Sequence, residues 1–218
     1  MIVIDRLTKT YWTHFRRKVV LSNVSVNLDP KLSYGLLGQN GAGKSTFLKL
    51  IAGTEAPTSG RIHRSVRMSW PLGFAGGFHP LMTGRENVRF LARVYDADIA
   101  EVTDFVEDFS ELGRDLDMPV KTYSSGMTSR LAFAVSMAIE FDFYLVDEIT
   151  AVGDSRFQLK CARAFAERRA RAGLIMASHS TGTIKDYCGA GMVLQKGRLM
   201  VFEDINDAIE VHRQAMEA

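Results

Sequence analysis

The sequence of 218 residues has little cysteine and no long hydrophobic run. Its two cysteines, Cys161 and Cys188, lack the spacing of a metal or redox site, so we expect buried free thiols in a reducing compartment. The longest apolar run, residues 131–139, is far shorter than the ~20 residues that a membrane span needs. The first residues do not resemble a signal peptide. These absences predict a protein that is cytoplasmic or bound peripherally to a membrane partner.

The composition is that of an ordinary soluble globular protein, with 46% hydrophobic and 24% charged residues. The net charge of +2 gives no reason to expect a nucleic acid as a partner. The length suits one domain, or one domain with a lobe inserted into it.

The strongest pattern lies at residues 38–45, Gly-Gln-Asn-Gly-Ala-Gly-Lys-Ser, which match the phosphate-binding pattern G-x-x-x-x-G-K-[ST] at every position. A short apolar run precedes it, and a helical pattern follows at residues 47–52. The glycines let the backbone wrap a phosphate, and the amides at the start of the helix face the anion. Lys44 can reach the β- and γ-phosphates, and the Ser45 hydroxyl can ligate Mg²⁺. We therefore expect a nucleotide site.

Apolar periodicity gives a coarse secondary structure around this loop. Strands are predicted at residues 2–4, 24–28, 61–68, 141–146 and 174–177, with a terminal hairpin over 192–202. Helices are predicted from the capping box at Thr83, over 99–109, after Ser124 and after Asp204. We expect residues 71–140 to form a mostly helical lobe, inserted into an α/β core of residues 1–70 and 141–218 within a single domain.

Polar residues follow two of the predicted core strands. Asp147 would lie at the carboxyl end of its strand, where open α/β sheets bind ligands, and could hold the Mg²⁺ that Ser45 also touches. Glu148 points elsewhere and could orient and deprotonate the attacking water. The alternative is a surface acidic pair. His179 ends another strand at the same edge, which favours a contact with the terminal phosphate over a structural role.

Two further features leave alternatives open. Ser124, Ser125 and Gly126 precede an apolar helix, and such a terminus is either a helix cap or a second anion site. Because the chain already has a phosphate loop, a second site makes sense if it faces the nucleotide of another subunit, which predicts a dimer with ATP at the interface. Tyr11 either stacks on adenine or packs in the core.

Together these motifs resemble the ATP-binding subunit of ABC transporters over nearly the whole chain. Residues 38–45 resemble Walker A, 143–148 Walker B, 123–127 the signature motif and 150–154 the D-loop. The resemblance implies a P-loop NTPase (RecA-like) α/β core, an N-terminal antiparallel β subdomain, an inserted α-helical subdomain and a head-to-tail homodimer that closes over two ATP molecules. It also favours adenine stacking by Tyr11, the A-loop aromatic, and phosphate sensing by His179, the switch histidine.

The resemblance assigns a role to each matching position. The implied catalytic residues are Glu148, His179 and Lys44. The implied ATP-binding residues are Tyr11, Gly38, Asn40, Gly41, Ala42, Gly43, Lys44, Ser45, Thr46, Ser124, Ser125 and Gly126. Ser45 and Asp147 are the implied Mg²⁺ ligands.

Several stretches are similar, more narrowly, to the ATPases of Gram-negative capsular-polysaccharide exporters: residues 69–78, 81–88, 121–127 and 146–154. This similarity implies a translocase ATPase on the cytoplasmic face of the inner membrane, bound peripherally to a dimeric permease within a larger envelope-spanning complex, with the polysaccharide as an indirect partner. An O-antigen or teichoic-acid exporter and a soluble non-transport ABC ATPase are the alternatives. O-antigen ATPases often carry an added carbohydrate-binding domain, for which this sequence has no room, so we expect the capsule group.

The sequence departs from the usual transporter pattern at two places. No glutamine occurs between Gln39 and Gln158, where the family has a Mg²⁺-contacting residue; a loop over 70–80 fills that place. We expect its aromatics, Trp70, Phe74 and Phe78, to lie near the membrane subunit, with packing in the helical lobe as the alternative. In the signature, Ser125 and Met127 replace the usual Gly and Gln. A basic cluster, Arg163, Arg168, Arg169 and Arg171, is expected to be a solvated helix face, with anionic lipid as a minor alternative.

Overall fold

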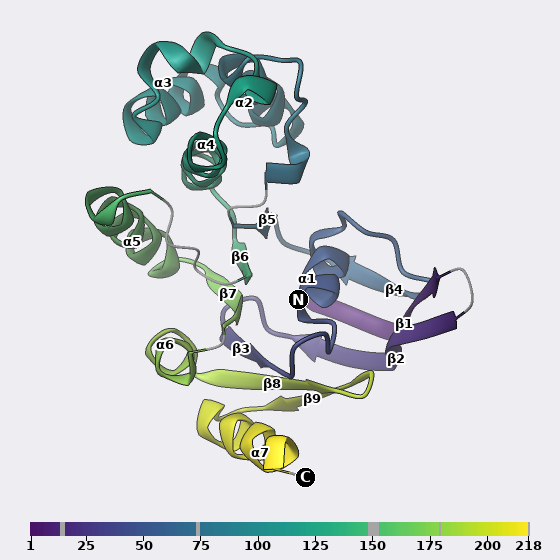
Figure 1. Cartoon of the computed structure of the whole chain (residues 1–218). Coiled ribbons are helices and arrows are strands. Elements are labelled where there is room, and N and C mark those ends of the chain that lie inside the picture. The colour runs from purple at the N-terminus through teal and green to yellow at the C-terminus, as the bar shows by residue number, and fades with distance from the viewer. Residues whose placement is uncertain (14–15, 73–74, 148–152, 179, 218) are drawn as a thin grey trace. The chain divides into compact units, whose positions relative to one another are not determined.

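The computed structural model describes residues 1–13, 16–72, 75–147, 153–178 and 180–217. Its contacts divide the chain into two units (Figure 1). The α/β unit contains residues 1–71, 141–149 and 172–218, and the helical unit contains residues 72–140 and 150–171. The contacts therefore group residues 150–171 with the helical segment.

The α/β unit contains two sheets. An antiparallel sheet has the order β2-β1-β4, and a six-stranded sheet has the order β5-β6-β7-β3-β8-β9. The strands are β1 (Ile2–Thr13), β2 (Arg16–Leu28), β3 (Ser33–Leu37), β4 (Ser59–Arg64), β5 (Met68–Pro71), β6 (Phe143–Asp147), β7 (Gly173–Ala177), β8 (Ala190–Gln195) and β9 (Arg198–Phe202). The helices of this unit are α1 (Lys44–Ala52), α6 (Thr181–Tyr187) and α7 (Ile205–Glu217). The predicted α/β core with its N-terminal antiparallel sheet is confirmed.

The central strands of the larger sheet are covered on both faces. Tyr34 and Leu36 of β3 belong to the same buried cluster as α1. Gly35 faces the other way because side chains alternate along a strand. A Cβ at Gly35 would lie 2.4 Å from Cγ2 of Ile184 in α6 and 2.8 Å from Cδ1 of Ile205 in α7. The glycine thus lets two helices pack closely on the face opposite α1, and this explains the near-continuous apolar strands.

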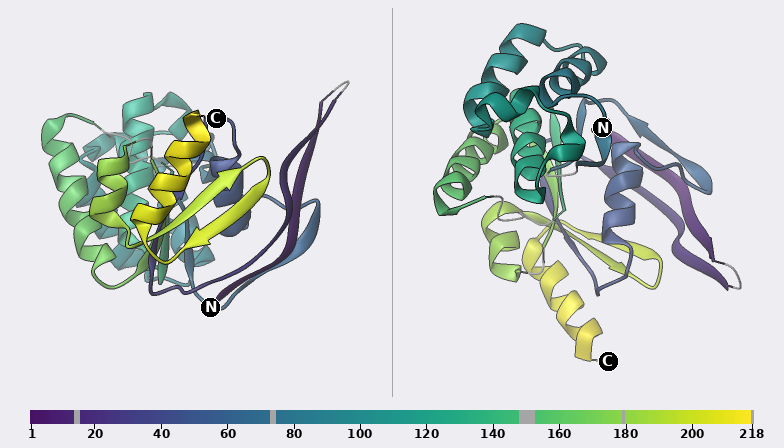
Figure 2. Two further views of the ribbon diagram at one scale, coloured as in Figure 1. Left: turned by 90° about the horizontal axis from the view of Figure 1, so that it is seen from below. Right: turned by 45° about the horizontal axis from the view of Figure 1, so that its top comes forward.

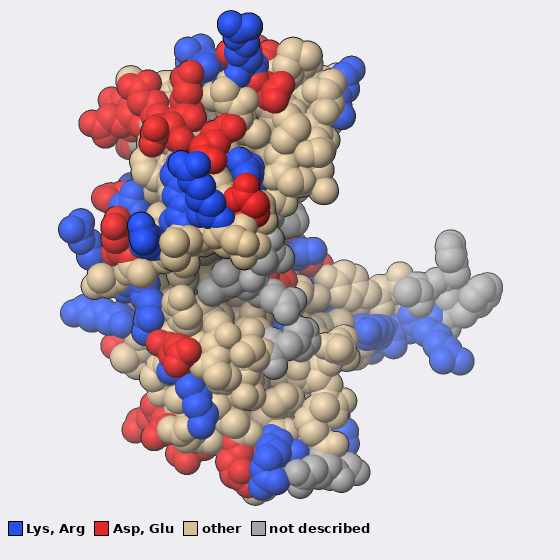
Figure 3. All heavy atoms as spheres, turned by 60° about the vertical axis from the view of Figure 1, so that its left-hand side comes forward, with Lys and Arg blue, Asp and Glu red and all other residues tan. Residues whose placement is uncertain are grey.

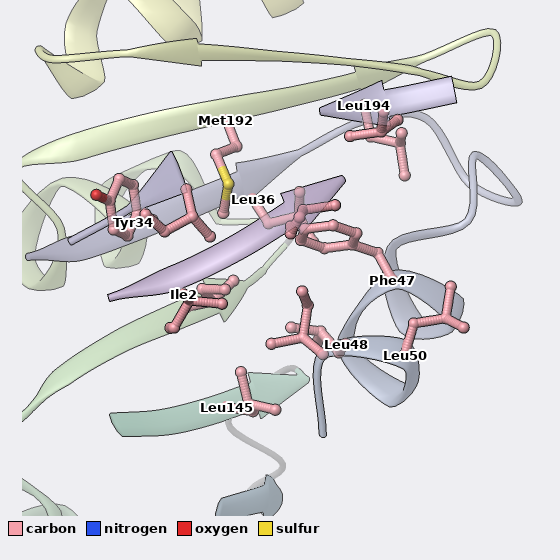
Figure 4. Close-up of a cluster of buried hydrophobic side chains, with 14 of the residues drawn as sticks. Ile2, Tyr34, Leu36, Phe47, Leu48, Leu50, Leu145, Met192 and Leu194 are labelled. Carbon is pink, nitrogen blue, oxygen red and sulfur yellow. The ribbon is translucent and has the colours of Figure 1, made fainter. Parts of the chain in front are cut away.

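The helix α1 brings the two sheets into one core. Its buried side chains, which include Phe47, Leu48 and Leu50, pack with Ile2 of β1 and Leu145 of β6 (Figure 4). The guanidinium of Arg64 in β4 donates to the carbonyl oxygens of Leu50 and Ile51, each at 2.6 Å. The end of a helix leaves carbonyls such as that of Ile51 without an intrahelical partner, whereas the Leu50 carbonyl also accepts from the Gly53 amide. The helix that carries the phosphate loop is therefore held along its length and at its end.

The strands β1 and β2 are much longer than the predicted segments 2–4 and 24–28. They pair from Ile2 with Leu28 to Thr13 with Arg16. The pairing of β1 with β4 runs only to Thr8 with Ser59. Beyond that point β1 and β2 continue as a two-stranded ribbon (Figure 2), and this ribbon carries Tyr11.

The prediction that Trp70 belongs to a surface loop was wrong. Trp70 lies in β5, is only 8% exposed, and packs edge-on against Phe141 with ring centroids 5.5 Å apart. Proline usually breaks a strand, but β5 is the edge of its sheet, where Pro71 is tolerated. The Ser69 hydroxyl accepts a 2.9 Å hydrogen bond from the Leu145 amide, at the irregular pairing of β5 with β6.

The helical unit is organised around aromatic side chains. Its helices are α2 (Gly84–Val94), α3 (Ile99–Ser110), α4 (Ser125–Ala138) and α5 (Ser155–Arg169), with short 3₁₀ turns η1 (Ala75–Gly77), η2 (Gly113–Asp117) and η3 (Val120–Thr122). The ring of Phe109 lies 6.1 Å from Phe133 and 5.8 Å from Phe157. The capping box predicted at Thr83 is present, with Glu86 as its second member.

The charged surface of this unit differs from expectation at Arg168, and Arg169 is half-buried rather than fully solvated. Arg168 does not belong to a solvated cluster: its guanidinium donates to the carbonyl of Met137 at 2.7 Å and to Glu140 at 2.5 Å. Arg163 and Arg171 are exposed, as predicted. Figure 3 shows acidic side chains gathered at the upper left of its view. The exposed face of α3 contributes Glu101, Asp104, Glu107 and Asp108.

Both cysteines are buried free thiols, as predicted. Burial raises the pKa of the Cys161 thiol to about 12, so this thiol stays protonated at neutral pH. No helix among the described residues is long and apolar enough to cross a membrane.

Candidate nucleotide site

The phosphate loop joins the end of β3 to the start of α1. Gly41 and Gly43 have φ values of 76° and 107°, which a residue with a side chain rarely adopts. A Cβ at Gly43 would also lie 2.2 Å from Cγ1 of Val20, whereas a Cβ at Gly41 would meet no atom within 4 Å. Gly43 is the N-cap of α1, and no side chain caps this terminus. The first amides of α1 therefore lack a side-chain cap, as an anion site requires.

Lys44 folds over the loop that precedes it. Its ammonium donates to the carbonyl oxygens of Gly38 at 2.6 Å and Gln39 at 3.3 Å. The loop thus curls around a positive charge, while the Ser45 side chain that follows is exposed. An ammonium at the centre of a curled backbone is suited to binding a polyphosphate.

Asp147 lies at the same edge of the sheet as the loop. Asp147 is in register with Ala177 of β7, and Ala177 is in register with Leu36 of β3. Two strand spacings place the Cα atom of Asp147 about 10 Å from that of Leu36, two residues before the loop begins. The half-buried Asp147 therefore lies at the sheet edge from which the loop leaves β3.

Tyr11 reaches this site from the β1–β2 ribbon. Its hydroxyl lies 3.5 Å from the Thr46 hydroxyl, in the first turn of α1, and donates to the Glu55 carboxylate. Burial and the contact with Glu55 raise the pKa of the Tyr11 hydroxyl, which is neutral at physiological pH. The aromatic ring thus lies beside the first turn of α1 and packs, partly buried, against the hydrophobic core.

A cavity of about 330 Å³ lies beside the loop. It is lined by residues 38–42 of the loop, by 193–196 of the β8–β9 hairpin, and by His212 and Ala215 of α7. Burial and the nearby charge of Lys44 lower the pKa of His212. Sequence reasoning missed His212, because a histidine on a terminal amphipathic helix gives no sign of which strand or loop the helix will cover.

The serines of the second predicted anion site belong to the helical unit. Ser124 caps α4: its hydroxyl accepts a 3.2 Å hydrogen bond from the Met127 amide. Ser124, Ser125 and Gly126 are all exposed. The cap predicted from the sequence is confirmed, and its surface is open to a ligand.

The predicted catalytic residues Glu148 and His179 lie outside the described residues, as do Phe74 and the D-loop positions 150–152. Asp154, the last D-loop position, caps α5 through a 2.9 Å hydrogen bond from the Phe157 amide. Among the residues that are described, no group of three or more His, Cys, Asp or Glu side chains could hold a metal ion. This is compatible with Mg²⁺, which is commonly held by one or two carboxylates together with substrate phosphates and water.

Comparison with protein families matches residues 21–151 to the family described as ABC transporter. The chain belongs to this family. The ABC family is one of ATP-hydrolysing cassettes, so the chain is an ATPase and binds nucleotide. The P-loop NTPase expectation is confirmed by a similar fold: an ATP-binding cassette solved as a dimer with ADP and Pi aligns with a TM-score of 0.75 and 20% identity, covering 94% of this chain and 99% of that one.

Several curated ABC proteins are similar over most of their length. The capsule polysaccharide export ATP-binding protein CtrD of Neisseria meningitidis is 48% identical over 97% of this chain and 98% of its own. The polysialic acid transport ATP-binding protein KpsT of Escherichia coli is 48% identical over 98% of this chain and 99% of its own. The O-antigen export ATP-binding protein RfbB of Klebsiella pneumoniae is 36% identical over 92% of this chain and 83% of its own.

Proposed function

We propose that this ABC ATPase powers the export of a capsular polysaccharide across the inner membrane through a separate permease. The observation that carries the proposal is full-length similarity. A capsule polysaccharide export protein, a polysialic acid transport protein and the ATP-binding protein BexA are 46–48% identical to this chain over nearly all of both chains. The O-antigen protein is less similar and matches over less of its length. An O-antigen exporter is therefore the second candidate, separable by substrate and partner.

The phosphate loop would bind the triphosphate of ATP. The glycines that accept positive φ, the uncapped amides of α1 and the Lys44 ammonium fit a polyphosphate. We assign the contacts to Gly38, Asn40, Gly41, Ala42, Gly43, Lys44, Ser45 and Thr46. Lys44 would exchange its bonds to the Gly38 and Gln39 carbonyls for bonds to phosphate oxygens.

Ser45 and Asp147 would hold Mg²⁺, whose charge neutralises the phosphates and the leaving group when it is bound. The donor set fits, since a hydroxyl and a carboxylate are the hard oxygen ligands that Mg²⁺ prefers. We assign Glu148 to accept the proton of the attacking water and His179 to hold the γ-phosphate. In the sequence, Glu148 directly follows β6 and His179 comes two residues after the end of β7.

Two copies of the chain would complete each site. Ser124, Ser125 and Gly126 offer an exposed helix terminus to a phosphate bound by a second subunit. Binding of ATP would close the head-to-tail dimer, and hydrolysis would reopen it. A mixed-dimer assay tests this arrangement: a Lys44→Ala subunit and a Ser124→Ala/Gly126→Asp subunit are each prepared, assayed alone and then assayed together.

In a mixed dimer, both defects fall in one site, and the other site is intact. Equal mixing should restore about a quarter of wild-type hydrolysis, because about half of the dimers are mixed and each has one working site of two. A mixture no more active than its components, with exchange of subunits verified, would show that the sites are not shared between copies.

The permease would be bound on the cytoplasmic face of the membrane, in part through the helical unit. In α2, Phe90 and Val94 are exposed one turn apart, and Leu81 is exposed before it. Exposed apolar residues at this density are typical of a protein interface. Phe78 is half-buried next to this segment, so Phe78→Ala and Phe90→Ala should weaken permease binding while hydrolysis by the free subunit persists.

The decisive experiment is to purify the protein from its native membranes and identify what copurifies. Copurification of a permease, together with loss of surface capsule and internal accumulation of polysaccharide in a Glu148→Gln strain, is the expected result. Accumulation of lipid-linked O-antigen instead would favour the second candidate. A protein that fractionates without any membrane permease would overturn the transport function.

A further inference from the structure

Tyr11 is fixed by two charged neighbours that no sequence motif singled out. The Lys9 ammonium lies 4.9 Å from the centroid of the Tyr11 ring. The same ammonium pairs with the Glu55 carboxylate at 2.7 Å and donates to the Ala56 carbonyl at 2.8 Å. The Tyr11 hydroxyl donates to the same Glu55 carboxylate. The Lys9 ammonium, the Tyr11 side chain and the Glu55 carboxylate thus each contact the other two.

Local structure brings these residues together. Lys9 and Tyr11 are two positions apart on β1, so their side chains leave the same face of the ribbon. Gly53 ends α1 in the left-handed region, with φ of 81°, and turns the chain back past the helix end. The backbone amides of Thr54 and Glu55 then donate hydrogen bonds to the Lys49 carbonyl, and these bonds fix the start of the turn. Glu55 is therefore held where it meets β1.

The contacts are shielded from water. The side chains of Lys9 and Glu55 are only 13% and 22% exposed. Burial alone would raise the pKa of Glu55, but the hydrogen bonds from Lys9 and Tyr11 outweigh it and lower that pKa. The carboxylate is therefore charged at neutral pH and remains a strong acceptor for both donors.

The arrangement leaves the Tyr11 ring with one orientation. Lys9 covers one face, so a flat base can stack only on the other. The hydroxyl is anchored to Glu55 and lies beside Thr46, which ties the ring to the first turn of the phosphate-loop helix. A ring that is already fixed loses less conformational freedom when a base binds.

We propose that Lys9 and Glu55 are positioning residues that hold Tyr11 as a one-sided platform for the base of the nucleotide. The proposal rests on the assignment of Tyr11 to the adenine. It predicts that the two residues support binding of the base and leave binding of the triphosphate unchanged. Inorganic tripolyphosphate, which has the phosphates without a base, is therefore the diagnostic ligand.

The test compares two variants by calorimetric titration with ATP and with tripolyphosphate. Lys9→Met/Glu55→Gln removes the pair without a change in net charge, and Tyr11→Phe keeps the ring but removes its anchor. Each should weaken ATP binding about threefold to tenfold and leave tripolyphosphate binding unchanged. KM for ATP should rise while kcat at saturation stays the same. A matched control, Asp5→Asn/Arg6→Gln, removes an exposed ion pair from the same strand and should change neither affinity.

Two further variants separate failure of this inference from failure of the assignment beneath it. Tyr11→Ala should weaken ATP binding more than either variant above, and adding Lys9→Met/Glu55→Gln to it should cost nothing more. If Tyr11→Ala leaves ATP binding unchanged, the base does not stack on Tyr11. If Tyr11→Ala weakens ATP binding but the pair variant does not, or if the pair variant weakens tripolyphosphate equally, the positioning role is wrong.

Discussion

The ammonium of Lys44 donates a 2.6 Å hydrogen bond to the carbonyl oxygen of Gly38, six residues before it. The lysine that we propose to bind phosphate therefore closes its own loop. Binding of the polyphosphate to Lys44, as proposed, would replace this internal hydrogen bond with bonds to phosphate oxygens.

Replacing this lysine should remove activity without unfolding the protein. Lys44→Met should lower ATP hydrolysis by about 100-fold or more, because the charge that we propose to stabilise the transferring phosphate is lost. The free energy of unfolding should change by only about 1–2 kcal/mol, since the variant loses the hydrogen bonds from the ammonium to the Gly38 and Gln39 carbonyls. Steady-state hydrolysis and urea unfolding measure the two effects. Lys31→Met, at an exposed turn, serves as the control.

The two inner glycines of the loop should respond differently to a methyl group. Gly41→Ala meets only the strain of positive φ and should destabilise the fold by about 1–2 kcal/mol. Gly43→Ala also drives a Cβ into Val20, and the total should reach about 2–5 kcal/mol. Denaturant unfolding of both variants provides the comparison. Equal losses for the two would mean that contact with Val20 does not constrain the loop.

Asn87 should prove important for the segment before α2. Its side chain is 1% exposed; its amide donates to the carbonyls of His79, Met82 and Thr83, and its oxygen accepts from the His79 amide at 2.7 Å. The three carbonyls also accept backbone amides, so Asn87→Ala leaves only the His79 amide without its acceptor. The loss of four side-chain hydrogen bonds should cost about 1–2 kcal/mol.

Limited proteolysis around residues 79–83, together with thermal unfolding, measures this loss for Asn87→Ala. Arg93→Ala, an exposed change on the same helix, should stay within about 0.5 kcal/mol of wild type. A variant at Asn87 with wild-type resistance to protease would show that the segment is held in another way.

Stability should depend on pH through His212. Its pKa in the folded state is below the ordinary value of 6.5, because of burial and the charge of Lys44. The unfolded chain therefore binds more protons as the pH falls through 6.5, and stability present above that pH is lost below it. Unfolding measured from pH 7.5 to 5 should show this decline. His212→Gln should flatten it, and an unchanged slope would exclude His212 as its source.

The phosphate loop and its surrounding strands were predictable because both signals are local. The glycine and lysine pattern follows from what a phosphate needs, and β3, β6 and β7 are buried almost throughout, as continuous apolar runs suggested. The Ser124 cap and the capping box at Thr83 likewise depend on neighbours within one turn.

The features that sequence reasoning missed depend on distant partners. Trp70 sits beside a proline, and only its place on an edge strand next to Phe141 makes it part of the core. The pairing of Lys9 with Glu55 joins β1 to the end of α1. The sequence indicated a solvated Arg168, but in the structure its guanidinium donates to the carbonyl of Met137. The local periodicity of the sequence does not predict such contacts between distant residues.

The strand order also constrains how the protein is made. Ser33 of β3 pairs with Leu174 and Tyr34 pairs with Ala190, so both neighbours of the phosphate-loop strand come late in the chain. During synthesis, the antiparallel sheet can form as soon as β4 leaves the ribosome. The strand β3 has no pairing partner on either edge until β7 and β8 are made. A nascent chain therefore gains its nucleotide site only near the end of translation, and until then it needs protection from aggregation.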